Sequence, residues 1–366
     1  MKERCLKRTL IIILICLAFC PQAFADFFPS GLITSDLTLT LAGSPYVVED
    51  NVLVMEGVTL TIEPGVEVNF VQNRSIQIDG ELIARGTESD QITFTGTSWG
   101  YIFFSDTSVD ATYDVNGDYT QGSILQYCLF ENGGYANPDD NGAIRVDESS
   151  PFISHCDIKN SGDNGIRVYN NGASKITHNT ITLSEGREIS VSSNKKTIIS
   201  HNQVSDNAGG IYADGDGDFT ISYNTITDNT GCDVGGGIYS DTSSSATITN
   251  NTVTGNTSND SGGGIYAKAS DSSSITDNNT IANNTIDASY HGNGAYLENP
   301  TEFNSNLVIG NRAIGSGGTS GIYVEGNPEF HYNNIYDNSG YALYCGNAQG
   351  ADSLDVTDCY WGTTDS

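Results

Sequence analysis

Basic side chains are scarce in this chain. Its 366 residues include 15 Lys and Arg against 45 Asp and Glu, which gives a formal net charge of −30 at pH 7. Binding to nucleic-acid phosphates or to an anionic lipid surface requires clustered Lys and Arg, so the composition argues against both partners. A strongly acidic surface instead keeps a protein soluble and attracts divalent cations.

Long apolar runs are absent after the amino terminus. The one apolar stretch, Leu10 to Phe19, follows four basic residues and is too short to span a bilayer comfortably. The sequence Ala23-Phe24-Ala25 behind it is typical of a signal-peptide cleavage site. We therefore expect residues 1–25 to be a signal peptide and the mature chain to have no transmembrane segment. The expected location is secreted or cell-surface, with the periplasm as an alternative.

Helical periodicity is missing as well, since the mature chain shows no recurrence of apolar residues every 3.6 positions. What recurs is an Asn two residues before an apolar residue, at spacings of 22 to 28 residues, with Cys in place of Asn near both ends. The members of the series are Cys128, Cys156, Asn179, Asn202, Asn224, Asn251, Asn279, Asn306, Asn333 and Cys359. A repeat of this length indicates a solenoid.

Each repeat contains three short β-branched runs separated by Gly, Asn, Asp and Ser. The first run follows glycine, as in Gly237-Ile-Tyr-Ser, the second ends just before the recurrent Asn, and the third begins at it. Three such strands make one turn of a parallel β-helix, whose turns stack about 4.8 Å apart. The sequence therefore predicts an all-β, three-strand solenoid of roughly eleven coils. Residues 26–45 are expected to form a lead-in or cap, and residues 46–366 the β-helix.

Stacking the repeats predicts two inward apolar columns. The first column contains Ile144, Ile166, Ile189, Ile211, Ile238, Ile265 and Ile322. The second contains Ile153, Ile176, Ile199, Ile221, Ile248, Phe303 and Phe330. Ile275 sits one residue early in the second column, which predicts a bulge or local slip. The recurrent Asn is expected to bond to its neighbours and to the corner backbone, which is a structural role.

The repeats resemble a known family. The Gly-Ile-Tyr runs, the opening stretch from Gly57-Val-Thr-Leu to Gly80-Glu-Leu-Ile, and the closing Cys359-Tyr-Trp-Gly-Thr are similar to the right-handed parallel β-helix proteins of the pectate-lyase-like superfamily. The resemblance covers residues 46–362 and implies a right-handed solenoid. That superfamily includes lyases, hydrolases, epimerases and adhesins, so it specifies the fold more than the function. Its members continue past the closing motif, and this chain ends at Ser366, which leaves open whether a carboxy-terminal cap is present.

The residue after each inward Ile of the first column points outward. This row contains Arg145 and Arg167, followed by the candidate substrate-binding residues Tyr212, Tyr239, Tyr266, Tyr296 and Tyr323. The resemblance implies that this face lines a saccharide cleft. Tyrosine rings offer apolar faces to pyranose rings and hydroxyls to their polar edges. The alternative interpretation is that the tyrosines only stack on one another and cover the sheet.

Arg145 and Arg167 are weak catalytic candidates. A polyuronate lyase needs a base near the sugar C5 and cations that neutralise the carboxylate. Four of the 15 basic residues leave with residues 1–25, and seven of the remaining 11 lie within 145–196. The Gly-His-Gly and Arg-Ile-Lys motifs of polygalacturonases and the Arg-x-Pro-x-x-Arg motif of pectate lyases are absent. Whether the protein is an enzyme stays open at this point.

One acidic turn is a weak candidate for a calcium site. Asp214, Asp216 and Asp218 place oxygens at alternate positions, as calcium loops do. The Gly and the Glu that complete such a loop are missing, and a solvated turn is the alternative interpretation. Calcium is the one cofactor that the sequence suggests.

Three histidines immediately precede the recurrent position on successive coils. His155, His178 and His201 would stack and could bind copper or zinc. Tyr127 and Tyr223 take the same place in other coils. This substitution pattern favours a slot that accepts flat polar side chains.

The mature chain retains five cysteines, namely Cys128, Cys156, Cys232, Cys345 and Cys359. Cys128 and Cys156 hold equivalent positions on consecutive coils, within the Cα separation that a disulfide allows. Cys345 and Cys359 could close the last coil, and Cys232 would then be the free thiol. The alternative is that the recurrent position simply accepts small buried thiols.

Together these features favour a secreted or surface β-helix module that binds extracellular polysaccharide or a cell-surface glycan, or supports adhesion, without catalysis. The alternative is a polysaccharide lyase or hydrolase that acts on an extracellular glycan. The acidic charge and the missing catalytic motifs favour the first.

Overall fold

The structure is a computed structural model of the chain, and it describes residues 26–28, 31–135, 142–269, 274–286, 290–299, 302–314, 320–346 and 354–362. The expected signal peptide, residues 1–25, lies outside the described residues. In the part that is described, no helix is long and apolar enough to cross a membrane.

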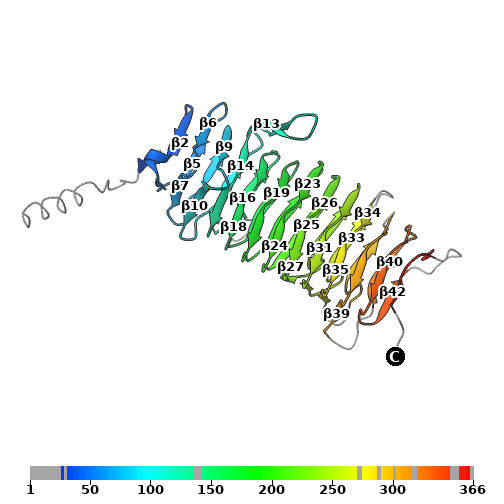
Figure 1. Cartoon of the computed structure of the whole chain (residues 1–366). Coiled ribbons are helices and arrows are strands. Elements are labelled where there is room, and N and C mark those ends of the chain that lie inside the picture. The colour runs from blue at the N-terminus through cyan, green and yellow to red at the C-terminus, as the bar shows by residue number, and fades with distance from the viewer. Residues whose placement is uncertain are drawn as a thin grey trace, which may run out of the picture.

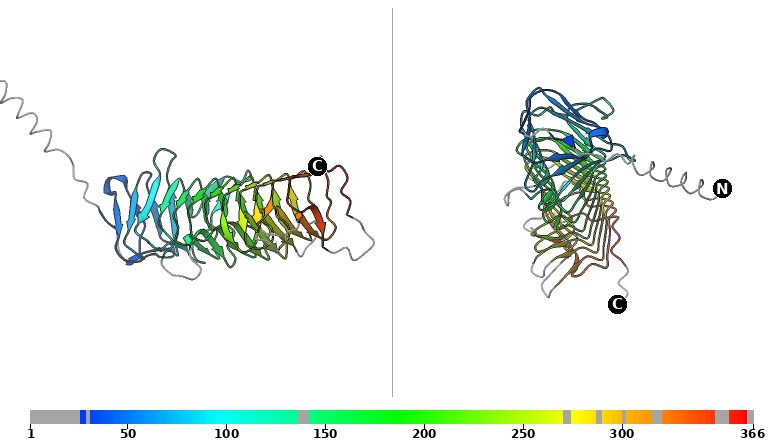
Figure 2. Two further views of the ribbon diagram at one scale, coloured as in Figure 1. Left: turned by 90° about the horizontal axis from the view of Figure 1, so that it is seen from below. Right: turned by 90° about the vertical axis from the view of Figure 1, so that its left-hand side faces the viewer.

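The chain winds into one elongated solenoid whose strands stack in parallel along the long axis (Figures 1 and 2). It is an all-β, right-handed parallel β-helix of about eleven turns, as the repeat predicts. Among the described residues, the one helical element is the 3-10 turn η1 (Leu41–Gly43). Each regular turn passes through three sheets, which we name A, B and C.

Sheet A has 13 strands in parallel order. They are β1 (Asp26–Phe27), β4 (Tyr46–Val48), β7 (Glu67–Phe70), β10 (Ile92–Gly96), β15 (Cys128–Glu131), β18 (Asp157–Lys159), β21 (Thr180–Thr182), β24 (Gln203–Ser205), β27 (Thr225–Thr227), β31 (Thr252–Thr254), β35 (Thr280–Ala282), β38 (Leu307–Ile309) and β41 (Asn334–Tyr336).

Sheet B also has 13 strands and forms the broadest outer face. They are β2 (Gly31–Ile33), β5 (Val52–Val54), β8 (Ile76–Ile78), β11 (Ile102–Phe104), β16 (Gly142–Asp147), β19 (Asn164–Tyr169), β22 (Arg187–Ser192), β25 (Gly209–Gly215), β29 (Ile238–Thr242), β33 (Ile265–Ala269), β37 (Ala295–Glu298), β40 (Ser320–Glu325) and β42 (Tyr341–Cys345).

Sheet C has ten strands, and a short fourth sheet has four. The strands of sheet C are β3 (Leu37–Leu39), β6 (Thr59–Ile62), β9 (Glu81–Arg85), β14 (Ile124–Gln126), β17 (Phe152–Ser154), β20 (Lys175–Thr177), β23 (Thr197–Ser200), β26 (Phe219–Ser222), β30 (Ala246–Thr249) and β34 (Ile275–Asp277). Those of the short sheet are β28 (Thr230–Cys232), β32 (Thr257–Ser258), β36 (Thr285–Ile286) and β39 (Arg312–Ala313).

The segment expected to be a lead-in, residues 26–45, already belongs to the solenoid. Its strands β1, β2 and β3 pair in parallel with β4, β5 and β6, one in each sheet. Alternation of apolar and polar residues extends into this segment, as in Leu37-Thr-Leu, so its strands can bury one face like those of any other turn.

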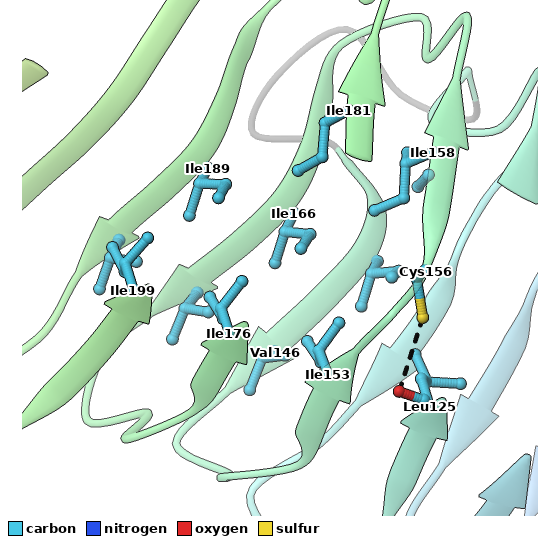
Figure 3. Close-up of a cluster of buried hydrophobic side chains, with 14 of the residues drawn as sticks. Leu125, Val146, Ile153, Cys156, Ile158, Ile166, Ile176, Ile181, Ile189 and Ile199 are labelled. Atoms are coloured by element: carbon cyan, nitrogen blue, oxygen red, sulfur yellow. Dashed lines mark hydrogen bonds between the residues drawn. The ribbon is translucent and has the colours of Figure 1, made fainter. Parts of the chain in front are cut away.

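The core is built from the inward columns that the register predicts. Ile144, Ile166 and Ile189 are consecutive partners in sheet B, and Ile153, Ile176 and Ile199 are consecutive partners in sheet C (Figure 3). All six are 0% exposed. Burying each such side chain contributes about 1.5–3 kcal/mol, and the contribution repeats with every turn.

The slip expected at Ile275 does not occur. Thr276 pairs with Ile248 and takes the inward place at 2% exposure, while Ile275 pairs with Thr247 and lies on the outer side. The register is therefore preserved, since shifting a strand by one residue would turn every side chain to the opposite face. The cost is one polar residue in the apolar column.

The recurrent asparagines form a buried column of hydrogen bonds. Asn224 donates from its backbone N and from Nδ2 to Asn251 Oδ1, at 2.9 and 3.0 Å, and also from Nδ2 to Ile199 O at 3.0 Å. Its own Oδ1 accepts the equivalent two bonds from Asn202. The same pattern runs from Asn179 to Asn333. Each side chain thus satisfies backbone groups that a tight corner would leave unpaired.

A second asparagine column, which the sequence reasoning missed, lies five residues further along each turn. Its members are Asn207, Asn229, Asn256, Asn284, Asn311 and Asn338. They are joined by the same bonds, such as Asn229 Nδ2 to Asn256 Oδ1 at 2.9 Å. Two of the solenoid's corners are therefore fixed by asparagine rather than one.

Neither expected disulfide is present, because the five cysteines in the described part of the chain are free thiols. Cys156 Sγ lies 3.5 Å from Leu125 O, a bond drawn in Figure 3, and Cys128 Sγ lies 3.5 Å from Ala84 O. The equivalent carbonyl one turn later, Ile153 O, accepts a hydrogen bond from Nδ2 of Asn179. The thiols therefore occupy the Asn position as buried polar groups, which was the alternative interpretation.

Residues 105–122 leave the solenoid between β11 and β14. They contain an antiparallel hairpin of β12 (Thr112–Tyr113) and β13 (Tyr119–Gln121), which projects from the side of the solenoid in Figure 1. Asp114 Oδ1 accepts the backbone N–H of Asn116 and Asp118 at 2.8 and 2.9 Å, which closes the tip of the hairpin. This hairpin forms one wall of a groove described below.

Candidate functional site

The two arginines and five tyrosines expected on one face form a single outward row on sheet B. Arg145 pairs with Arg167, Arg167 with Ser190, and Ser190 with Tyr212. The row continues through the register partners Tyr239, Tyr266, Tyr296 and Tyr323. Arginines and tyrosines therefore share one surface, but they occupy different parts of it.

The arginine part of the row borders an open groove of about 420 Å³. We call it the sheet B groove; its lining includes Arg145, Arg167, Tyr169, Asn170, Ser192, Asn194 and Asp214. The strands β16, β19, β22 and β25 supply these residues from four successive turns. A groove that crosses parallel strands suits an elongated ligand that lies along the solenoid axis.

Aromatic rings hold Arg145 in place. Its guanidinium carbon lies 4.6 Å from the centroid of the Tyr101 ring and 5.7 Å from that of Tyr169. Its Nη2 donates to the Tyr169 hydroxyl at 3.2 Å. Cation–π contacts of this kind contribute about 0.5–2 kcal/mol each. The charge is thereby fixed at the groove without being neutralised by a carboxylate.

Arg167 is positioned by hydroxyl groups instead. Its Nη1 donates to Ser190 Oγ and, at 3.4 Å, to Ser192 Oγ. On the following turn Arg187 lies over the Tyr212 ring, with its guanidinium carbon 3.9 Å from the centroid. Three arginines on three successive strands of sheet B thus gather at the boundary between the groove and the tyrosines.

One carboxylate faces this groove. Asp214 Oδ2 accepts a hydrogen bond from the Tyr212 hydroxyl at 3.1 Å. Asp214 Oδ1 is buried and has no hydrogen-bond partner among the described residues. Burial, reinforced by the charge of Asp214, raises the pKa of Tyr212, so its hydroxyl remains a proton donor at neutral pH.

The tyrosines stack on one another, which is the geometry of the alternative interpretation of this row. Centroids of neighbouring rings are 4.6 to 5.2 Å apart, with interplanar angles between 5° and 13°. Each face within the column is covered by the next ring, and Arg187 covers the free face of Tyr212. Only the ring edges remain accessible.

Those edges are acidic. Tyr239 donates its hydroxyl to Asp241 at 3.3 Å, and Tyr323 donates to Glu325 at 2.8 Å. Burial and the neighbouring carboxylates raise the pKa of Tyr296 to about 12. The tyrosine part of the row therefore presents paired hydroxyls and carboxylates rather than apolar faces, and it repels an acidic ligand.

A second groove, of about 520 Å³, lies on sheet C under the hairpin β12–β13. We call it the sheet C groove. The strands β17, β20 and β23 form its floor, where His155, His178 and His201 stand in one line. The ring centroids are 4.8 and 4.7 Å apart and the planes are inclined by 2° and 7°.

The histidine line continues into tyrosine at both ends. Tyr127 lies 4.7 Å from His155 and Tyr223 lies 5.0 Å from His201, between ring centroids. Every one of these residues has a positive φ of 49° to 58°. The position is therefore a corner slot that accepts flat polar side chains, as the sequence pattern favours.

Residues 119–286 match the family model described as the right-handed beta helix region. The chain has the right-handed parallel β-helix fold. Its fold is similar to that of a mutant of the periplasmic alginate epimerase AlgG, at 12% identity and a TM-score of 0.50, over 87% of this chain and 78% of the other. At this identity the likeness shows the fold alone.

Two further matches are more limited. The mannuronan C-5 epimerase AlgE4 A-module of Azotobacter vinelandii shares 12% identity over 95% of this chain and 94% of that module, with a TM-score of 0.33, which carries no argument. Protein bark beetle of Drosophila melanogaster is 40% identical over 68 residues. That match spans 19% of this β-helix protein and only 2% of the length of the Drosophila protein.

The aspartates proposed for calcium do not converge in this β-helix. Asp216 Oδ1 accepts from Ser243 Oγ, and Asp218 Oδ1 accepts from Ser244 and Ser245, while Asp214 faces the Tyr212 hydroxyl. Across the described ranges, no three His, Cys, Asp or Glu side chains are arranged to hold a metal ion. Hydroxyl groups of the following turn satisfy the carboxylates of Asp216 and Asp218 instead.

Several site residues were not found from the sequence. Tyr101 and Tyr169 border the sheet B groove, and Arg85 and Lys175 border the sheet C groove. Tyr169 could have been found, since it lies two residues after Arg167 on the same outward face. Arg85 could not have been found, because 90 residues of chain separate it from Lys175, which lines the same groove.

Proposed function

We propose that this protein is an exported β-helix module that binds an acidic polysaccharide in the sheet B groove without catalysis. The observation that carries the proposal is the pair Arg145 and Arg167, on adjacent strands and in register, with Arg145 held against the aromatic rings of Tyr101 and Tyr169. Guanidinium groups bind carboxylates in a forked geometry, and aromatic rings pack against sugar rings.

A path for a polymer continues from this groove toward the amino terminus. The outward row there contains Phe103 and Gln77, and a second hollow of about 220 Å³ lies beside Gln77 and Tyr101. Tyr101 borders both the hollow and Arg145. We infer that the glycan lies along the axis over these turns, since the carboxylates beside the tyrosines repel it in the other direction.

The overall charge limits how such binding can work. A mature chain with 11 basic and 44 acidic residues repels a polyanion at long range. Binding is then confined to the few turns where Arg145, Arg167 and Arg187 gather. We therefore expect selectivity for short acidic stretches rather than for densely charged polymers.

One observation favours the alternative, a polysaccharide lyase. Asp214 Oδ1 is buried without a hydrogen-bond partner among the described residues and lies in the same groove as both arginines. A carboxylate so placed could accept a proton from a sugar carbon, with the Tyr212 hydroxyl beside it as a donor. Binding without turnover would exclude this alternative.

The direct test uses the chain from residue 26 with polygalacturonate, alginate and a neutral glucan, and measures both binding by calorimetry and the release of unsaturated or reducing ends. We expect binding of an acidic polymer without turnover. Arg167→Ala should weaken it about tenfold, and Arg167→Lys should restore only part, because Lys lacks the forked donor geometry. Arg312→Ala, in an exposed ion pair with Asp337, is the matched control. Equal binding by Arg167→Ala and the control would overturn the proposal, and turnover would favour the lyase.

A further inference from the structure

The sheet C groove is built from groups that the sheet B groove does not use. Its floor carries the line of three imidazoles, and a cation stands on either side: Arg85 at the end of β9 and Lys175 on β20. Such a concentration is unusual in a chain with so few basic residues. Its volume of about 520 Å³ is within the range of ~300–1,000 Å³ typical of ligand sites.

The two cations are held by hydrogen bonds to neutral oxygen acceptors and by contacts with aromatic rings. Lys175 Nζ donates to Gly117 O at 2.8 Å and lies 5.6 Å from the centroid of the Phe152 ring. Arg85 Nε donates to Gln126 Oε1 at 2.8 Å, and its guanidinium carbon lies 5.9 Å from the Tyr119 ring centroid. Both side chains retain N–H donors for a ligand. The aromatic rings beside them form an apolar wall of the groove.

The imidazoles are oriented alike. Nδ1 of His155 shares a hydrogen bond with Ser154 Oγ at 3.0 Å, and Nδ1 of His178 shares one with Thr177 Oγ1 at 2.8 Å. These bonds leave Nε2 of His155 and of His178 as the nitrogen available to a ligand, and the His201 ring is stacked parallel to that of His178. Since the planes differ by only 2° and 7°, the Nε2 atoms form a line rather than a cluster.

That geometry opposes a metal and suits an anion. A zinc or copper ion requires nitrogen lone pairs that converge on one point at about 2.0–2.1 Å, and parallel rings cannot provide this. Parallel rings instead present a row of N–H donors to one ligand when they are protonated. Protonated rings at this spacing repel one another, so an anion that lies along them removes the repulsion.

We propose that the sheet C groove is a second binding site, for an anionic sugar whose carboxylate lies between Lys175, Arg85 and the histidine line. The ring of the sugar would pack against Phe152 and Tyr119, and the negative group would accept from the cations and from Nε2 of the imidazoles. This site is on a different sheet from the sheet B groove, so either can fail without the other.

Proton uptake makes this site sensitive to pH. Burial lowers the pKa of both His155 and His178, and the other histidines with Lys175 lower that of His178 further. In the free protein these rings are therefore neutral at pH 7, and the groove then holds two fixed cations. A bound anion favours the protonated rings, so the affinity should rise as pH falls.

Acidic groups nearby oppose the anion and set its limits. Asp118 lines the groove from the hairpin, and Glu88 raises the pKa of His155 through its charge. Tyr113, Tyr119, Tyr127 and Tyr223 are further titratable groups that face the histidines or the cations. Within the groove lining, the two cations Arg85 and Lys175 outnumber the one carboxylate, Asp118, and each protonated ring adds to the attraction.

The corner slot supplies conservative variants. Asn250 and Asn278 occupy the same position on other turns, with φ of 58° and 57° against 58° at His178. His178→Asn therefore removes an imidazole with a residue that this backbone accepts elsewhere in the chain. Tyr223→Asn makes the same change one turn beyond the groove and is the matched control.

The experiment titrates the chain from residue 26 with trigalacturonate, inorganic sulfate and neutral maltotriose at about pH 5 and pH 7.5, and follows the imidazole nitrogen signals by NMR. We expect trigalacturonate to shift the His178 signals and to bind about tenfold more tightly at the lower pH, corresponding to a rise of about one unit in an imidazole pKa. His178→Asn should abolish most of this pH dependence and Lys175→Gln should weaken binding at both pH values. Tyr223→Asn should change neither.

Three results would overturn the proposal: no shift of the His178 signals, equal affinity for maltotriose or sulfate, or an unchanged pH dependence in His178→Asn. Arg167→Ala separates the two sites, because it removes a group of the sheet B groove only. If Arg167→Ala abolished the response of the histidine signals, the ligand would be bound in the sheet B groove and not in the sheet C groove. Loss of polymer binding with Arg167→Ala while that response persists would support both sites.

Discussion

His178 and Asn179 are neighbours in the chain and lie on opposite sides of the same corner. Asn179 is buried at 1% exposure and bonds to Asn202 and to Ile153 O, whereas the His178 ring is exposed and stacks on two other imidazoles. The inner position is Asn on seven successive turns. The outer position varies among Tyr, His, Asn and Ser over those turns.

This difference shows which positions of the solenoid tolerate substitution. An inner Asn supplies two N–H donors and an acceptor to groups that have no access to water, whereas a Ser or Thr hydroxyl has only one donor. The outer slot requires only a side chain that tolerates a positive φ and stacks. The outer side chain of a turn can therefore be replaced without altering the hydrogen bonds inside the turn.

Removing an inner amide is expected to have the largest effect. Asn224→Ala deletes the side chain that accepts two bonds from Asn202 and donates to Ile199 O and Asn251. Each buried group left unpaired costs about 1–3 kcal/mol, so we expect a loss of about 3–5 kcal/mol. Denaturant unfolding followed by circular dichroism measures this loss. Tyr223→Asn, in the outer slot next to it, should change stability by less than about 0.5 kcal/mol.

The second asparagine column allows the same loss of stability to be measured at another corner of the solenoid. Asn229→Ala in the second column removes the same set of bonds, since Asn229 donates to Val204 O and Asn256 and accepts from Asn207. We expect a loss within about 1 kcal/mol of that for Asn224→Ala. A second column that proved dispensable would show that only one corner holds the solenoid together.

A buried acid inside the solenoid predicts a pH effect. Glu188 is 0% exposed in a position that is glycine on the neighbouring turns, and burial raises the pKa of its carboxyl well above 4.5. Above pH 4.5 the unfolded chain ionises this group while the folded chain keeps the proton. The unfolded state then binds fewer protons, so stability falls as pH rises, by about 1.4 kcal/mol for each unit until the folded pKa is reached.

Glu188→Gln removes that dependence while keeping the shape of the side chain. Unfolding free energies of the two proteins should agree near pH 4 and diverge above it, with the glutamine variant the more stable. Parallel curves for the two proteins would show that Glu188 is not the group responsible.

The smallest effect is expected where the inner column ends. Cys156→Asn extends the column by one turn, because the new Nδ2 can reach Leu125 O and Asn179 Oδ1, where Cys156 now donates from Sγ and from its backbone N. Adding such a bond contributes about 0.5–1.5 kcal/mol. Thermal unfolding should show a modest gain, with Cys232→Asn, in a different position, as a control without gain.

The sequence predicts the parts of this molecule that repeat. The spacing of Asn179, Asn202 and Asn224 fixes the register, and the register identifies both the inward isoleucines and the outward arginines. The second column was visible as Asn202 and Asn207, five residues apart, but only Asn284 among its members lies two residues before an Ile or Val. The same register predicts that the tyrosines stack on one another, but it does not predict that Arg187 covers the end face of the column at Tyr212.

Parts that interrupt the repeat could not be predicted in the same way. The sheet C groove depends on the path of the hairpin β12–β13, which brings Gly117 to Lys175 across 58 residues. No period connects these positions. The disulfide of Cys128 and Cys156 was suggested by their distance along the stack, but both thiols turn to backbone carbonyls as the asparagines do.

The adjacent pair His178 and Asn179 offers the most direct test of the division between a structural interior and a binding exterior. Unfolding free energy and trigalacturonate affinity at about pH 5 would be measured for His178→Asn and Asn179→Ala. The account predicts that His178→Asn retains the stability of the parent within about 0.5 kcal/mol and loses binding, while Asn179→Ala loses about 3 kcal/mol or more. A large loss of stability in His178→Asn, or wild-type stability in Asn179→Ala, would contradict it.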